Sequence, residues 1–216
     1  MRRTALLLLT LVLGTADAAT AQSTRVGMTV RLAPETTPGA GHQPIIGIVN
    51  LFRDTRWSEA LEQAFPIRLH FRIEIWRSRE SWIDEFQRFA EWSIVVQREP
   101  LEENYRVTDI LQAGTSEARF PSRIELERNI GTERQIEVLP RGTGTFYYNV
   151  RLRIRALSDE DMDELERFLA GETNTPRTER SPLARSMRRL FLRMAGLPSE
   201  DLEIRSEKFT VPGRRD

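Results

Sequence analysis

The sequence predicts an α+β fold that is mainly antiparallel β, with a sandwich-like sheet, a long central hairpin and a few short helices. Two long segments, residues 67–76 and 146–155, alternate between apolar and polar side chains. This alternation is typical of strands with one buried and one solvated face. The regular alternation of strands and helices that a parallel doubly wound sheet requires is missing. An antiparallel arrangement is therefore favoured.

The segment before the first long strand predicts two shorter strands and one helix. Apolar residues at alternate positions from Val26 to Leu32 indicate a strand with one buried face. The predicted elements, in order, are a strand at 25–32, a Pro- and Gly-rich loop at 33–44, a strand at 45–52, and a helix that begins at Asp54 or Ser58 and ends near Ala64.

Residues 67–76 are predicted to form the first arm of the central hairpin. Their polar face holds Arg68, His70, Arg72, Glu74 and Trp76. A polar turn at 78–81 leads to the second arm, whose apolar face is expected to hold Phe86, Ala90, Trp92, Ile94 and Val96. The spacing of Trp82, Ile83, Phe86 and Phe89 would also suit a helix, which leaves the beginning of this arm open between the two structures.

The rest of the chain predicts short elements around the second long strand. Ser122 and Glu125 have the spacing of a capping box at the start of a helix. The predicted elements are a strand at 105–111, a helix from Ser122 to about Ile130, a strand at 136–139, a turn at 141–144, the long strand at 146–155, a helix that Ser158 caps and Gly171 ends, a polar linker at 172–182, an amphipathic helix at 183–195 and a final strand at 202–211.

Residues 1–21 have the three-part layout of a secretory signal peptide. Arg2 and Arg3 precede an apolar run from Ala5 to Leu13, and two small-x-small sites follow at 16–18 and 19–21. The run is shorter than the roughly 20 residues that span a bilayer. We expect cleavage near Ala21, an extracytoplasmic location, periplasmic or secreted, and a single globular domain over residues 22–216.

The composition excludes several classes of function. Lys and Arg total 32 and Asp and Glu total 32, so the chain has no net charge with which to attract nucleic acid. Cysteine is absent, which excludes disulfides, thiolate metal sites and cysteine nucleophiles. No nucleophile-elbow or cofactor-binding motif occurs, and we expect no cofactor.

The sequence signals for metal-binding and anion-binding sites are weak. His42 and His70 have no acidic partner at metal-ligand spacing. Asp159, Asp161 and Asp163 have calcium-loop spacing but lack its later positions, and they suit the first turn of a helix better. The segment Arg141–Thr145 leads into a strand, which favours a hairpin turn over a phosphate cradle.

The polar faces of the two long strands offer a candidate surface for an anionic ligand. One strand carries Tyr147, Arg151, Arg153 and Arg155, and the other carries Arg68, His70 and Arg72. These side chains would form one surface if the two strands shared a face. A merely solvated face is the more common outcome for such a pattern.

The helix at 183–195 is the one other candidate interaction surface. Its cationic and apolar sides include Arg185, Met187, Arg188, Arg189, Phe191 and Arg193. Docking of the apolar side on the sheet is the favoured interpretation. A helix lying at a membrane interface or docked on a partner protein is the alternative.

The central region resembles a bacterial family of exported proteins, the domain of unknown function 4390. The resemblance rests on Glu59–Leu61, Phe65–Ile67, Trp82–Glu85, Leu101 and Tyr105–Val107. It covers roughly residues 26–157, and more loosely 203–206. Ala64 stands where the family usually has Gly. The resemblance implies an exported domain and assigns no activity or catalytic residues.

Two functional hypotheses follow. The first is a non-enzymatic extracytoplasmic interaction or envelope-associated domain, whose partner is an unidentified envelope protein or a membrane surface. The alternative is a small-ligand-binding protein or a hydrolase that uses carboxylates and arginines from separate strands. A concave pocket holding two or more carboxylates with shifted pKa values would favour the alternative.

Overall fold

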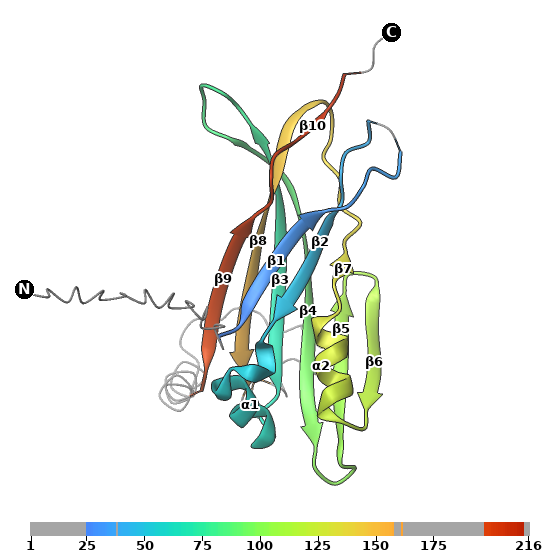
Figure 1. Ribbon diagram of the computed structural model, residues 1–216, viewed down its shortest axis with the longest axis vertical. Helices are drawn as coiled ribbons and strands as arrows, with labels where there is room; N and C mark the ends of the chain where they lie inside the picture. Colours follow the sequence, from blue (N-terminus) through green and yellow to red (C-terminus); the bar gives the residue numbers. More distant parts are fainter. Residues whose placement is uncertain (1–24, 38, 158–160, 162–196, 214–216) are drawn as a thin grey trace, which may run out of the picture.

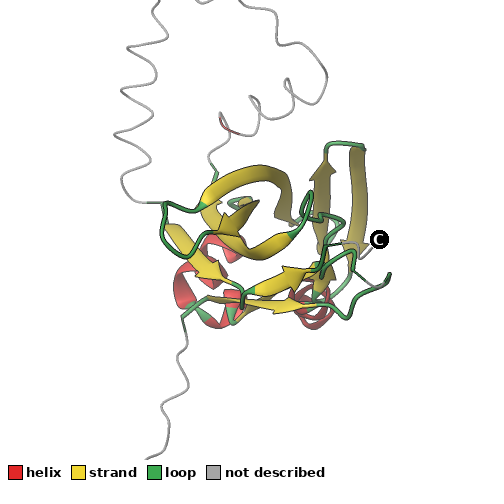
Figure 2. Ribbon diagram, turned by 90° about the horizontal axis from the view of Figure 1, so that it is seen from above, coloured by secondary structure: helices red, strands yellow, loops and turns green. Residues whose placement is uncertain are grey.

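The computed structural model describes residues 25–37, 39–157, 161 and 197–213. Within those residues the chain forms ten strands in two sheets, together with short helices at the sheet ends (Figure 1). Seen from above, the two sheets form two layers, and the larger one is strongly curved (Figure 2). The predicted mainly antiparallel, sandwich-like α+β fold is confirmed.

The small sheet has three antiparallel strands in the order β1-β2-β7. Their bounds are β1 Gly27–Leu32, β2 Pro44–Val49 and β7 Arg134–Gln135. The strand predicted at 136–139 is therefore misplaced. Ile136 N–H still donates to Pro44 O at 3.0 Å, but Val138 N–H turns back to Ile136 O at 2.8 Å, which ends the ladder.

The large sheet has the order β10-β8-β3-β4-β5-β6, and β9 also pairs with β8. All its pairings are antiparallel, and the β3–β4 hairpin is the long central hairpin that the sequence predicts. The bounds are β3 Ile67–Ser78, β4 Glu85–Glu99, β5 Asn104–Leu111, β6 Gly114–Phe120, β8 Gly144–Ala156, β9 Ser199–Arg205 and β10 Phe209–Val211.

The core lies between the two sheets. The apolar faces of β3 and β8 point into it, and Ile67, Leu69, Ile73 and Val150 are fully buried there. Ile46 and Ile48 of β2 belong to the same apolar cluster, so the small sheet covers this face of the large one. The opposite face of the large sheet carries the polar side chains of both long strands.

A β-bulge in the central hairpin corrects one sequence prediction. The register places Ile75 opposite Arg88 but Trp76 opposite Phe86, so Gln87 is the extra residue. Phe86 therefore lies on the polar face instead of the apolar one. The amide of Gln87 explains the bulge, because it donates to Arg141 O and accepts from Arg141 N–H, both at 3.1 Å.

Two α-helices pack against the sheets, α1 at the lower ends of the strands and α2 alongside β6 (Figure 1). In α1 (Thr55–Glu62) the Asp54 side chain accepts from Arg56 N–H, and in α2 (Arg123–Gly131) Ser122 accepts from Glu125 N–H, as the cap patterns predict. The strand predicted at 45–52 ends earlier than expected. Asn50 adopts a left-handed φ of 61° and begins a short 3-10 turn, Leu51–Arg53.

Two further differences concern strands near the polar face. The strand predicted at 202–211 is divided into β9 and β10, because Ser206 leaves the ladder and its hydroxyl accepts from Tyr148 N–H at 2.9 Å. Strand β6 has no counterpart among the predicted elements, because its side chains are exposed almost throughout and give no apolar periodicity. The second arm of the central hairpin is a strand from Glu85 onward, while Trp82 and Ile83 lie in the connection before it, so the helix alternative for this segment is wrong.

The connection from β8 to β9 begins and ends at one place. Arg155 pairs with Ser199, and Ala156 N–H donates to Pro198 O at 3.1 Å. The helix predicted after Ser158, the linker at 172–182 and the helix at 183–195 lie within this connection and outside the described residues. The predicted signal peptide at 1–21 also lies outside them.

Candidate functional site

The polar face of the large sheet brings together side chains from four adjacent strands. We call this surface the outer face, since it points away from the small sheet. Directly paired residues on neighbouring strands share a face and form rows across the sheet. The rows across β4, β3, β8 and β9 are Phe89–Glu74–Asn149–Arg205, Glu91–Arg72–Arg151–Glu203, Ser93–His70–Arg153–Asp201 and Val95–Arg68–Arg155–Ser199.

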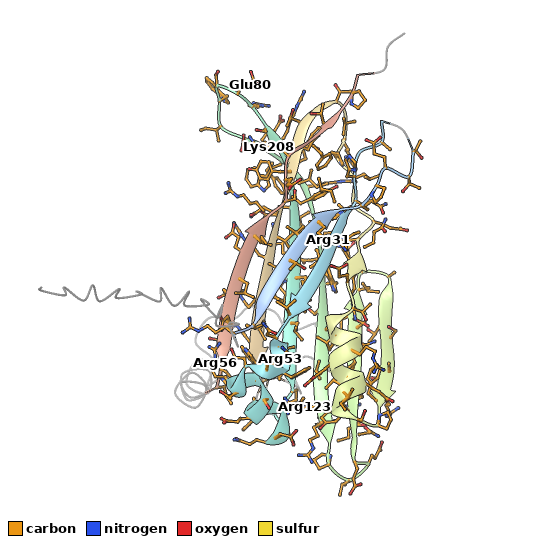
Figure 3. All side chains as sticks on the ribbon, viewed as in Figure 1. Arg31, Arg53, Arg56, Glu80, Arg123 and Lys208 are labelled. Atoms are coloured by element: carbon orange, nitrogen blue, oxygen red, sulfur yellow. The ribbon has the colours of Figure 1, made fainter. Side chains whose placement is uncertain are left out.

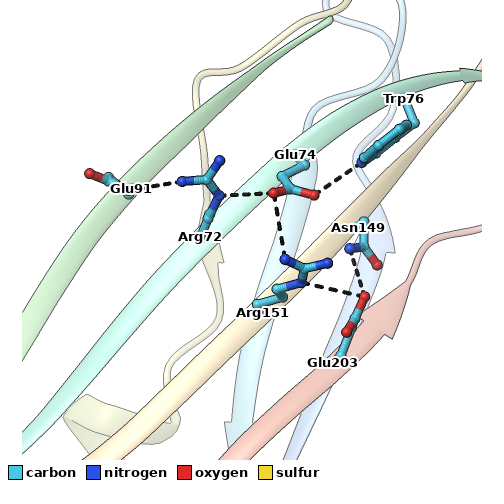
Figure 4. A network of polar contacts seen from close by, with 7 residues as sticks. All are labelled: Arg72, Glu74, Trp76, Glu91, Asn149, Arg151 and Glu203. Atoms are coloured by element: carbon cyan, nitrogen blue, oxygen red, sulfur yellow. Dashed lines mark hydrogen bonds and ion pairs between the residues drawn. The ribbon is translucent and has the colours of Figure 1, made fainter. Parts of the chain in front are cut away.

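Glu74 is the centre of a polar network on this face (Figure 4). One carboxylate oxygen accepts from Arg72 Nε at 2.9 Å and lies 3.8 Å from Arg151 Nη1, and the other accepts from Trp76 Nε1 at 3.1 Å. The Glu74 side chain is 7% exposed. Burial alone would raise the pKa of Glu74, but the two hydrogen bonds and the two guanidinium charges outweigh it and lower that pKa below its ordinary value.

The network continues through β8 into β9. Arg151 Nε lies 3.5 Å from a Glu203 oxygen that also accepts from Asn149 Nδ2 at 2.8 Å (Figure 4). Asn149 is 3% exposed, and its Oδ1 has no hydrogen-bond partner among the described residues. The Oδ1 atom is itself buried, so the structural contribution of this amide is the hydrogen bond by which Nδ2 holds Glu203 in position.

His70 lies opposite Ser93 in the row beside that of Arg72, and Arg68 lies in the row after it. His70 Nδ1 and Ser93 Oγ are 3.0 Å apart, and Arg68 donates to the same hydroxyl from Nε and Nη2 at 3.3 and 3.1 Å. Burial, and then the charge of Arg68, lowers the pKa of His70 below its ordinary value. Arg153 in the same row pairs with Asp201 at 2.8 Å.

The other end of the outer face is aromatic. Trp76 and Phe86 meet edge to face with their ring centroids 5.5 Å apart. Tyr147 donates to Asp84 at 2.9 Å, and the Arg205 guanidinium lies 5.6 Å from the centre of the Tyr147 ring. The bulge at Gln87 places Phe86 here, since without it Phe86 would face the core.

A groove of about 460 Å³ runs along the middle rows of the outer face. Its lining includes His70, Arg72, Glu74, Arg151, Arg153, Asp201 and Glu203. The Arg151 and Arg153 side chains are 53% and 54% exposed, so the groove is open to solvent. It offers fixed guanidinium donors and carboxylate acceptors to a polar ligand, in a geometry set by hydrogen bonds between strands.

Part of this surface is predicted by the sequence. The condition on which it depended holds, because β3 and β8 are paired neighbours and their arginines share one face. The contributions of Ser93, Asn149, Asp201 and Glu203 were missed. Asp201 lies outside the strand predicted at 202–211, and for the other three neither the order of strands in the sheet nor the pairing register can be read from periodicity.

The other candidate residues lie apart from the outer face. His42 Nδ1 is 2.7 Å from Ala33 O, and its ring meets Phe209 edge on. Residues 141–143 bend into β8, which begins at Gly144, but the predicted hairpin turn is wrong, because the preceding strand β7 pairs with β2 in the other sheet. Arg185, Met187, Arg188, Arg189, Phe191 and Arg193 lie outside the described residues.

The described part of the chain holds no candidate metal site and no candidate membrane-spanning helix. Among those residues, no group of three His, Cys, Asp or Glu side chains converges in a way that could hold a metal ion. None of the helices in that part is both long and apolar enough to cross a bilayer. Asp159 and Asp163, two of the three acids with calcium-loop spacing, lie outside it.

Comparison with protein families decides the classification. The model of a domain of unknown function, DUF4390, matches residues 49–161. The chain belongs to the DUF4390 family. The DUF4390 match runs from the end of β2 past the end of β8, so it contains β3, β4 and β8 of the outer face but excludes β9. No curated protein and no solved structure gives a significant match to the chain.

Proposed function

We propose that this DUF4390 protein is an exported, non-enzymatic interaction domain that binds its ligand or partner in the outer-face groove. One observation carries the proposal. The sheet register aligns Arg72 with Arg151 and His70 with Arg153 on one face, where they line an open groove. Long strands fix such side chains more firmly than loops do, and preorganised donors favour binding because little order is lost.

The ionisation of the groove supports binding in preference to proton transfer. A general acid that works near neutral pH needs a raised carboxyl pKa, as in glycosidases. The pKa of Glu74 is lowered instead, and both of its oxygens are occupied by donors from the chain. The other two carboxylates of the groove, from Asp201 and Glu203, form ion pairs with Arg153 and Arg151. These features suit a carboxylate that holds arginines in position.

The export part of the proposal is supported by residues 1–21. A basic start, a short apolar run and two Ala-x-Ala sites are the pattern of a cleaved signal peptide. An exported domain meets envelope components, so the ligand is sought there.

The groove can be tested with two matched pairs of substitutions. Arg153→Gln with Asp201→Asn removes an ion pair from the groove, and Arg31→Gln with Glu133→Gln removes one from the small sheet (Figure 3 labels Arg31). All four side chains are at least 43% exposed, so both variants should fold.

Mature protein and both variants would be immobilised and exposed to envelope fractions, and retained components identified by mass spectrometry. We expect a component that the wild type and the Arg31/Glu133 variant retain and the Arg153/Asp201 variant loses. Equal retention by all three proteins would remove the groove from the proposal.

A further inference from the structure

The last row of the outer face differs from the others in its charge. Arg72 pairs with Glu74 and Glu91, Arg151 with Glu74 and Glu203, and Arg153 with Asp201. In each of those rows a flanking strand supplies a carboxylate. Arg68 and Arg155 are directly opposite each other, but their flanking residues are Val95 and Ser199. Among the described residues neither arginine forms an ion pair.

We propose that the Arg68–Arg155 row binds the phosphate group of a ligand that lies along the groove. The inference rests on the proposed function, because it names the chemistry of the ligand that the groove holds. Directly opposed like charges on a sheet are destabilising when nothing compensates them. A bound anion between the two guanidinium groups removes this repulsion and uses donors that no carboxylate of the described chain occupies.

The charge of the row selects the class of anion. Two unpaired cations are neutralised by a dianion, and a phosphate monoester carries roughly −1.5 to −2 at neutral pH, while a carboxylate carries −1. Two guanidinium forks also offer enough donors for three phosphate oxygens. Arg68 donates only to Ser93 Oγ among the described residues, so its remaining N–H groups are available.

The surroundings of the row strengthen its attraction for an anion. Val95 is 3% exposed and Leu157 is 8% exposed, and these two side chains form a small apolar cluster beside the arginines. A guanidinium next to apolar groups loses part of its hydration, which increases its interaction with an opposite charge. Burial, and then the neighbouring charge of Arg155, lowers the pKa of Arg68, which agrees with a cation that lacks an anionic partner.

The row lies beside the groove and can act together with it. His70 and Arg153 line the groove and occupy the row next to Arg68 and Arg155. A ligand with its phosphate on the Arg68–Arg155 row would therefore extend past His70 toward Asp201 and Glu203. The carboxylates of these two residues are 69% and 49% exposed and can accept further hydrogen bonds, which suits hydroxyl or amine groups on the rest of the ligand.

The experiment measures phosphate binding by mature protein at constant ionic strength. Isothermal titration and thermal melting would be recorded with inorganic phosphate, glycerol 3-phosphate and, as a monoanion, acetate. Vesicles containing phosphatidic acid form a further arm, which separates a lipid headgroup from a soluble phosphate. We expect saturable binding and a rise in Tm with a phosphate probe, and no such effect with acetate.

The variants locate the site. Arg155→Gln should weaken phosphate binding by at least about tenfold, and Arg155→Lys by less, because lysine keeps the charge without the fork. Arg141→Gln is the control, since Arg141 is exposed in the turn before β8 and far along the strand from Arg155. Circular dichroism tests whether each variant is folded. If Arg155→Gln does not fold, the comparison uses Arg155→Lys in its place.

The outcomes distinguish this inference from the proposed function. No saturable binding of any phosphate probe by folded wild type, or equal binding by wild type and the Arg155 variants, overturns the phosphate row. The proposed function stands in that case if the Arg153/Asp201 variant still loses the envelope component. The opposite result is also possible. If Arg155→Gln abolishes phosphate binding, the inferred phosphate site is supported. If the Arg153/Asp201 variant retains the same envelope components as the wild type, the proposed function of the groove is overturned.

Discussion

Ala64 adopts a conformation that favours glycine. It follows α1 with a φ of 62°, and Phe65 N–H donates to Ala60 O while Ala64 N–H donates to Leu61 O. These two bonds are the Schellman arrangement, whose left-handed residue is usually Gly. The family resemblance places Gly at this position, and the backbone of this chain gives the physical reason.

Replacing Ala64 with Gly should stabilise the protein. The left-handed conformation costs a residue with a Cβ about 1–2 kcal/mol, and the greater freedom of Gly in the unfolded chain returns about 0.4–1 kcal/mol of this. We expect a net gain of up to about 1 kcal/mol in the free energy of unfolding, measured with urea. Ala118→Gly, in exposed strand β6, is the control and should lose stability.

Glu74 should contribute more to stability than the other acids of the outer face. Glu74→Gln keeps the shape but removes the charge that Arg72 and Arg151 face. Hydrogen bonds to charged groups contribute about 1.5–3 kcal/mol, and we expect a loss in that range in urea denaturation. Glu203→Gln, at a side chain 49% exposed, should cost less than about 1 kcal/mol. A similar cost for both would mean that burial of Glu74 does not matter.

The same carboxylate makes stability depend on pH. The pKa of Glu74 is lower in the folded chain than its ordinary value of 4.5, so the unfolded chain takes up this proton first as pH falls. The stabilisation is complete above the ordinary value and is lost as pH falls through the folded-state value. Urea midpoints from about pH 7 to about pH 3 should therefore fall more steeply for wild type than for Glu74→Gln.

At the scale of elements, the bulge at Gln87 organises one end of the outer face. Gln87→Ala removes both hydrogen bonds to the Arg141 backbone. We expect a loss of about 0.5–1.5 kcal/mol in unfolding free energy, together with a shift of the Arg141 amide resonance. Gln112→Ala, in the exposed β5–β6 turn, should change stability by less than about 0.5 kcal/mol. An unchanged Arg141 resonance would contradict the role of Gln87.

Periodicity predicted the long strands well because their buried faces are continuous. Residues 67–75 and 146–154 alternate without interruption, and both are strands with the predicted faces. The bulge could not be predicted in this way, because it depends on a side-chain contact between Gln87 and a segment distant in the chain. Strand β6 was missed for the opposite reason, since it buries almost nothing.

The sequence predicted the polar residues of each long strand separately, but not how the two strands combine into one site. The row of Arg68 and Arg155 depends on the antiparallel register of β3 with β8, which the sequence pattern does not give. The acids of β9 joined the site through a pairing that follows a long connection in the chain. Long connections leave the order of strands undetermined by sequence pattern alone.

At the scale of the whole molecule, export remains a prediction of the N-terminal sequence. Expression of the full chain in a bacterial host with a general export pathway should yield extracytoplasmic protein that begins at Gln22. Intact-mass and N-terminal peptide mass spectrometry measure this directly. Replacement of Ala19 and Ala21 with bulky residues should block cleavage at this site. Recovery of uncleaved protein in the cytoplasm would contradict the prediction.

The predicted helix at 183–195 gives a second test at this scale. If its apolar side meets a membrane interface, mature protein should sediment with liposomes, and deletion of residues 183–195 should abolish this. Cosedimentation that is unchanged by the deletion would exclude the membrane interpretation. A loss of folding on deletion would instead favour docking of the helix on the sheet.

Ala156 and Pro198 bring the two ends of the connection between β8 and β9 together. Because the chain leaves and re-enters at adjacent, hydrogen-bonded positions, an Asn-Gly turn could join the two strands directly as an ordinary hairpin. Such a shortened chain would retain every strand of the outer face. The two ends of the connection thus mark the place where a shortened chain can be closed without moving any strand that the structure describes.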